Sequence, residues 1–124
     1  MLLQFLVPET EARQDGTGAA VALERAGAPV LVTLGIDRIL EQQTLHVSVW
    51  GSSDGQQWHS LVNFPRKSYC GVYSLLLDLG AHPDIRFLRA QWKMGSWANE
   101  YRNPLFGFQV TLDSEPRLSQ AAAR

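Results

Sequence analysis

Large apolar residues recur at every second position along much of the chain, a pattern typical of β-strands rather than helices. The segment 106–112 is the clearest example, because its alternate residues are Phe106, Phe108, Val110 and Leu112. A second segment, 87–94, has an apolar face opposite a mostly basic one, formed by Leu88, Ala90, Trp92 and Met94 against Phe87, Arg89, Gln91 and Lys93. Apolar residues do not recur at intervals of three and four residues over any length that would form a helix. We therefore expect short strands to dominate the fold.

Three more segments are predicted as strands. Residues 28–36 form an almost continuous apolar run rich in β-branched residues, which favours a central strand. Residues 72–80 place one apolar face on alternate positions, namely Tyr73, Leu75, Leu77 and Leu79. Residues 2–7 predict an edge strand that ends at Pro8, because proline cannot donate a hydrogen bond to the ladder.

Two connecting segments are less regular. In residues 13–20, Asp15, Gly16 and Gly18 predict a turn, since glycine adopts the positive φ values that tight turns demand. This turn is expected to lead into a short strand that begins at Ala20. Residues 37–43 fit either one helical turn or a loop.

The stretch VSVWGSSDGQQWHSLV, residues 47–62, predicts a β-hairpin. With Asp54 and Gly55 as the two central residues of a tight turn, Trp50 lies opposite His59. One face of this hairpin is then core and includes Trp58, which we expect to anchor the hairpin. Trp50 and His59 lie on the other face, where they either pack under a neighbouring element or form an exposed patch that favours association.

Together these segments predict an all-β fold, a single antiparallel β-sandwich of the jelly-roll kind with about seven or eight strands. A chain of 124 residues fits one domain, which we place at residues 1–113. The polar, alanine-rich residues 114–124 are expected to form a flexible C-terminal tail.

Composition and charge narrow the class of partner. The chain is 45% hydrophobic and 19% charged with a net charge of -1, which is ordinary for a globular domain and argues against nucleic acid as a partner. Charge is uneven, because residues 1–62 carry seven acidic and three basic side chains whereas residues 63–102 carry three and six. The second half is therefore expected to hold any anion-attracting patch.

The number of cysteines and the first residues of the sequence indicate the cellular compartment of the protein. A single cysteine, Cys70, excludes an intramolecular disulfide and favours a reducing environment. The first residues lack the basic start of a signal peptide, and no segment reaches the ~20 apolar residues of a membrane helix. We therefore expect a cytoplasmic protein with no membrane partner.

Catalytic and metal-binding patterns are weak. The three histidines, His46, His59 and His82, are too scattered for a zinc motif. Cys70 is expected to be a small buried residue at a strand start rather than a nucleophile. No phosphate-binding or dinucleotide-binding glycine motif occurs. We expect no enzyme activity, no metal and no cofactor.

Two loops have the composition of contact surfaces. The loop from Gly95 to Asn103 offers Trp97, Asn99, Tyr101 and Arg102, and a second loop offers Arg66, Lys67 and Tyr69. Aromatic rings beside amide and guanidinium groups suit a sugar or a protein hot spot. The alternative is that Trp97 and Tyr101 fold inward and cover the open end of the sandwich.

The hairpin VSVWGSSDGQQW, the later IRFLRAQWKM and the closing FGFQVTL resemble the discoidin and coagulation-factor C-type modules. The same arrangement is similar to β-sandwich accessory proteins of phage heads and tails. The resemblance covers roughly residues 45–112, and it implies a galactose-binding-like jelly roll whose end loops bind sugars, lipid headgroups or protein surfaces. This chain lacks the usual paired cysteines of those modules.

These observations predict a non-enzymatic recognition or assembly module. Protein association is the first expectation, with the chain itself or a larger assembly as partner, and we expect a homo-oligomer because an edge strand at residues 2–7 offers pairing between chains. Carbohydrate binding is the alternative, supported by the discoidin-like hairpin and the loop aromatics.

Overall fold

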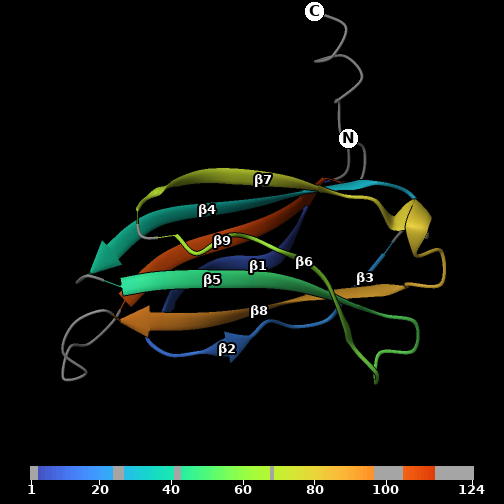
Figure 1. The fold of residues 1–124 in the computed structure, drawn as a ribbon, viewed down its shortest axis with the longest axis horizontal. Helices are drawn as coiled ribbons and strands as arrows, with labels where there is room; N and C mark the ends of the chain where they lie inside the picture. Colours follow the sequence, from blue (N-terminus) through green and yellow to red (C-terminus); the bar gives the residue numbers. More distant parts are fainter. Residues whose placement is uncertain (1–2, 24–26, 41–42, 68, 97–104, 114–124) are drawn as a thin grey trace, which may run out of the picture.

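The structure is a computed structural model that describes residues 3–23, 27–40, 43–67, 69–96 and 105–113, and it is built from two antiparallel sheets (Figure 1). The four-stranded sheet has the order β1 (Leu3–Ala12), β9 (Leu105–Asp113), β4 (Val30–Leu40) and β7 (Gly71–Leu77). The second sheet has the order β2 (Gly16–Thr17), β8 (Phe87–Ser96), β5 (Gln43–Ser52) and β6 (His59–Asn63), and β3 (Val21–Ala22) also pairs with β8. The only helical turn in the described part of the chain is the 3-10 turn η1 (Leu79–Ala81).

The strand pairs are nested within one another along the chain. The hairpin β5–β6 lies innermost, followed by β4–β7, then β2 and β3 with β8, and finally β1 with β9. Members of successive pairs belong alternately to the two sheets, which is the topology of a jelly roll. The predicted all-β sandwich is therefore confirmed. The described residues form nine strands, one more than the upper predicted number of eight, because β2 and β3 are two short strands that both pair with β8.

The core is made by the inward-facing residues of both sheets. Its most buried large side chains come from nearly every long strand: Leu6, Val32, Leu34, Leu45, Val47, Leu88, Phe106, Phe108, Val110 and Leu112. At the edge of this core the rings of Trp92 and Phe108 meet edge to face, with centroids 5.3 Å apart. Each such side chain contributes about 1.5–3 kcal/mol by burial, so the period-two pattern is what holds the sheets together.

Two strands run further than the sequence predicts. Strand β1 continues through Pro8 to Ala12, and β4 continues through Asp37 to Leu40. The pairing of β1 with β9 shifts between Phe5 and Thr10, and Pro8 is exposed there on an edge strand, where its missing N–H breaks no ladder bond. The pairing of β4 with β9 shifts at Asp37. A bulge in β1 thus replaces the predicted strand end. Of the segment predicted as a helical turn or loop, residues 37–40 belong to β4 and Gln43 begins β5, while residues 41–42 lie outside the described residues.

The segment 13–20 crosses from β1 to the second sheet, and the prediction of a glycine turn with positive φ is wrong. Gly16 and Gly18 do not have positive φ, and Gly16 lies in β2 opposite Trp92. A Cβ at Gly16 would lie 2.5 Å from the indole ring of Trp92. The indole Nε1 donates to the carbonyl of Gln14 at 3.1 Å, and the backbone N–H of Met94 donates to the Asp15 carboxylate at 2.7 Å. Glycine is therefore required at position 16 because the Trp92 ring lies so close to the backbone.

The flexible tail predicted at residues 114–124 lies outside the described residues.

Gly16→Ala is expected to destabilise the protein by about 1–3 kcal/mol, because the added methyl group must displace the Trp92 ring. Gly35→Ala is the matched control, since a Cβ there makes ordinary contact, 3.6 Å from the Gln109 side chain. Urea unfolding of both variants measures the difference. Equal stabilities for the two would contradict the packing role of Gly16.

Candidate functional site

The tip of the β5–β6 hairpin is a loop of residues 53–58, organised by its own side chains. The Ser52 hydroxyl accepts from the backbone N–H groups of Asp54 and Gly55 and donates to the Asp54 carboxylate. That carboxylate accepts from the N–H groups of Gln56 and Gln57 at 2.8 and 3.0 Å. Gly55 in this loop has a positive φ of 80°, which glycine adopts readily. The predicted two-residue turn at Asp54 and Gly55 is therefore replaced by a longer loop in which Ser52 and Asp54 satisfy the backbone.

The longer loop changes the register of the hairpin. Trp50 lies opposite Ser60 and Gly51 lies opposite His59, so the predicted pairing of Trp50 with His59 is wrong. The register shifts between Val49 and Trp50, which leaves Leu61 as the extra residue of a bulge. The prediction of one apolar face is confirmed for β5, whose inward residues include the fully buried Val49.

Trp58 is not part of the core as predicted. It is half-buried, and the guanidinium carbon of Arg89 lies 4.2 Å from the centre of its ring. Arg89 lies opposite Trp50 on β8, so Trp58 lies against the outer face of this sheet. Trp50 is also half-buried, and its Nε1 donates to the Ser48 hydroxyl at 2.9 Å. Loop closure by Asp54 thus places Trp58 beside a cation rather than among apolar side chains.

This outer surface of β5 and β8 is here called the cationic face, and it contains two adjoining hollows. The first, of about 120 Å³, is lined by His46, Ser48, Trp50, Asn63, Gln91 and Lys93. The second, of about 240 Å³, is lined by Asp15, Thr44, His46, Arg66, Lys93 and Met94. His46 and Lys93 line both, since they lie opposite each other on neighbouring strands. The face therefore combines amides and an indole in one hollow with cations in the next.

The structure separates the residues predicted in the second contact loop. Backbone bonds between Leu45 and Lys67 hold the segment beside β5 and bring Arg66 to the cationic face. The ammonium of Lys67 instead lies 4.0 Å from the centre of the Tyr73 ring, and Tyr69 is 77% exposed. The other predicted contact residues, Trp97, Asn99, Tyr101 and Arg102, lie outside the described residues, so their role stays a prediction.

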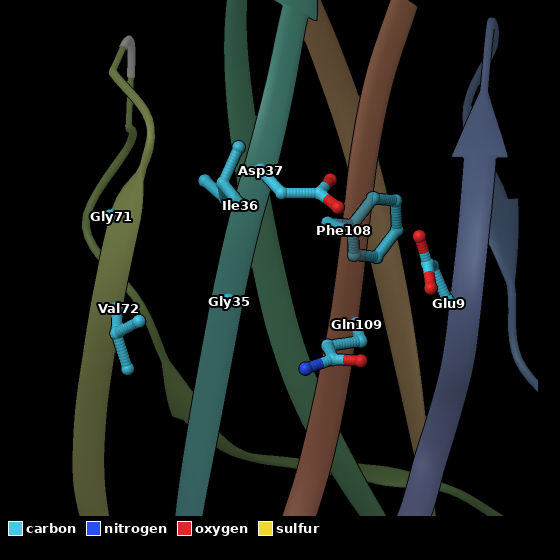
Figure 2. A pocket seen from close by; sticks show the side chains of 8 residues that line it. All are labelled: Glu9, Gly35, Ile36, Asp37, Gly71, Val72, Phe108 and Gln109. Atoms are coloured by element: carbon cyan, nitrogen blue, oxygen red, sulfur yellow. The ribbon is translucent and has the colours of Figure 1, made fainter.

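The outer face of the four-stranded sheet has a different character. It contains a hollow of about 280 Å³ whose lining residues are drawn in Figure 2: Glu9, Gly35, Ile36, Asp37, Gly71, Val72, Phe108 and Gln109. The carboxylates of Glu9 and Asp37 approach β9 from either side (Figure 2), because each residue stands at an irregular step in its strand. A Cβ at Gly107 would lie 2.7 Å from a carboxylate oxygen of Asp37, so glycine makes room for that group.

Large apolar side chains are exposed on the same face of the sheet, and one of them, Val72, lines this hollow. Val72 is 75% exposed, Leu76 is 48% exposed and Phe5 is 51% exposed. Together with the half-buried Leu31, which lies opposite Leu76, these residues form what is here called the apolar face. Sequence analysis missed it, although the outward positions of the nearly unbroken apolar run in β7 gave a signal: polar residues are expected there on a strand with one solvated face.

Cys70 is exposed and free, so the expectation of a buried cysteine at a strand start is wrong. It directly precedes β7. Within the described ranges no three His, Cys, Asp or Glu side chains gather as a metal site would require, and no helix there is long and apolar enough to span a membrane.

Comparison of the chain with models of known families, with curated proteins and with solved structures found no match.

The hydrogen bonds to the Asp54 carboxylate make the stability of the fold depend on pH. The N–H groups of Gln57 and Gln56 and the Ser52 hydroxyl lower the pKa of Asp54 from 3.8 to about 2. Because the folded-state pKa is the lower one, the ionised group stabilises the fold above about pH 4, and this contribution is lost as pH falls towards 2. The stability difference between the wild type and Asp54→Ala is therefore expected to shrink over this range in melting experiments. A difference that stays constant from pH 5 to 2 would contradict the assignment.

Proposed function

We propose that this protein is a non-enzymatic β-sandwich module that associates with protein through the apolar face. The exposure of Val72, at 75%, on the solvent side of a sheet is the single observation that carries the proposal. Leu76 and Phe5 extend the exposed apolar area, which monomeric proteins usually keep small. Association with a partner removes these apolar side chains from water, and this burial contributes favourably to the free energy of binding.

The centre of this sheet is suited to close packing against another surface. Its outward residues are small: Thr33 and Gly35 on β4 and Thr111 on β9, with Ser74 next to them on the outer strand β7. The hydroxyls of Thr33 and Ser74 bond each other at 2.9 Å, so their desolvation leaves that pair satisfied. Small central residues within an apolar rim form a broad contact surface rather than a deep cleft, which favours a protein over a small molecule.

The two edge strands of the four-stranded sheet also favour a protein as the partner. Strands β1 and β7 are the two outer strands, and each pairs with only one other strand in the described part of the chain. Pro8 and the shifted register make β1 a poor template for further pairing, whereas β7 pairs with β4 through seven consecutive residue pairs without a bulge. Association over β7 therefore covers both Val72 and its strand edge.

The variant Val72→Ser with Leu76→Ser tests the apolar face. We expect self-association to weaken at least about tenfold, while stability changes by no more than about 0.5 kcal/mol per site because both side chains are exposed. Light scattering after size exclusion, over a hundredfold range of concentration, measures the first quantity, and thermal melting measures the second.

Tyr69→Ser is the matched control, because it removes an equally exposed apolar side chain from the loop before β7. Association lost in Tyr69→Ser but retained in the double serine variant would move the contact to the predicted loop and overturn the proposal.

A second function, carbohydrate binding, is supported by the smaller hollow of the cationic face. An indole, Trp50, and two amides, Asn63 and Gln91, line it, and such groups orient sugar hydroxyls. The discoidin-like hairpin of residues 47–62 supports the same candidate.

A glycan array is the test of this second candidate. Asn63→Ala with Gln91→Ala is expected to abolish any glycan signal without unfolding the protein, since neither side chain is in the core. An array on which the wild type binds no glycan would eliminate this function.

A further inference from the structure

We propose that copies of this chain stack face to back, with the apolar face of one copy on the cationic face of the next. This inference rests on the proposed function and adds to it the partner, a second copy, and the symmetry of the contact. It is carried by the opposite charges that the sandwich presents on its two outer surfaces.

The apolar face carries the negative groups. Glu9 and Asp37 are both exposed and lie on either side of β9 in the hollow of Figure 2, which Val72 on β7 also lines. The other charged pair of this region is self-compensating, because the Arg38 guanidinium donates to the Glu11 carboxylate. The charge offered to a partner at this hollow is therefore negative.

The cationic face carries the complementary groups. Arg66 and Lys93 are exposed and share the larger hollow with His46. The carboxylate of Asp15 at the rim of this hollow is engaged by the backbone N–H of Met94, and it faces two cationic side chains. The nearby half-buried rings of Trp50 and Trp58 supply apolar area for Val72 and Leu76 to cover.

The two charged regions lie at the same end of the molecule. Only residues 41–42 join the end of β4 to the start of β5, so Asp37 and His46 lie close to one connection (Figure 1). The end of β8, beyond Lys93, pairs with the start of β5 there. A second copy displaced along the normal to the sheets, without a rotation, therefore sets its cations opposite the carboxylates of the first.

Such a contact is heterologous, since each copy uses two different surfaces. It leaves one apolar face and one cationic face free at the ends, so further copies add until the array closes or the concentration limits it. The expected behaviour is an average mass that rises steadily from the 13.8 kDa monomer without stopping at a dimer. Raising NaCl from about 50 to about 500 mM is expected to weaken it, since salt screens exposed charges.

Charge reversal on each face tests the stack. Arg66→Glu with Lys93→Glu disables the cationic face, and Glu9→Lys with Asp37→Lys disables the opposite one. Each variant alone is expected to be monomeric in sedimentation velocity. An equimolar mixture of the two is expected to restore association into arrays in which the variants alternate, because the two wild-type faces are complementary in charge and so are the two reversed faces.

The controls reverse charges elsewhere. Asp84→Lys and Arg86→Glu each reverse one charge at the end of the molecule away from the two hollows. Arg86 lies there because its backbone N–H donates to the carbonyl of Ser52 at the end of β5. Both are expected to associate as the wild type does. Melting curves verify folding, and Glu9→Gln with Asp37→Asn replaces the lysine variant if that one unfolds, with the same expected loss of self-association.

The outcomes separate this inference from the proposed function. Association that survives Arg66→Glu with Lys93→Glu but is lost in Val72→Ser with Leu76→Ser overturns the stack and leaves the apolar face as a two-fold interface. A wild type that remains monomeric at every concentration overturns the stack but not the proposed function, because the protein that covers the apolar face is then a different chain. A mixture of the two charge variants that stays monomeric also overturns the stack.

Discussion

The unbroken ladder between β5 and β8 is the constraint on which both outer surfaces depend. Ten consecutive pairs, from Gln43 with Ser96 to Ser52 with Phe87, fix which side of the sheet each residue faces. Since side chains alternate along a strand, a slip of β8 by one residue would bury Lys93 and expose Leu88, which is now fully buried. The gathering of His46, Arg89 and Lys93 outside the sandwich is therefore a direct result of burying the opposite residues.

The four-stranded sheet shows what happens where the ladder is interrupted. Strands β1 and β4 both shift register against β9, and the residues at these steps are Glu9 and Asp37. A bulge redirects side chains that the alternation would otherwise place elsewhere. The same irregularities that lengthen the two strands thus set two carboxylates on one surface, at either side of β9.

The inward faces of the strands could be predicted from the sequence, because burial imposes a period of two on residues such as Leu34 and Phe108. The connections could not be predicted with the same success. Pro8 was expected to end a strand, and Asp54 was expected to sit in a two-residue turn, since local preferences do not report bulges or side-chain bonds to the backbone. The apolar face was missed because strand periodicity identifies buried positions and says little about which solvent-facing positions remain apolar. Arg66 was identified as a contact residue, but its alignment with Lys93 depends on pairing between distant segments.

The nested pairing of the strands also orders events during synthesis. The hairpin β5–β6 needs only its local loop, whereas β1 pairs with β9, the last of the described strands to leave the ribosome. Until residues 105–113 emerge, the flank of β1 that β9 later occupies and the adjacent flank of β4 are both open. Loop closure over so long a separation is slow, and open strand edges pair readily with other nascent chains. The jelly roll therefore concentrates its risk of misassembly in the interval before its final strand inserts between β1 and β4.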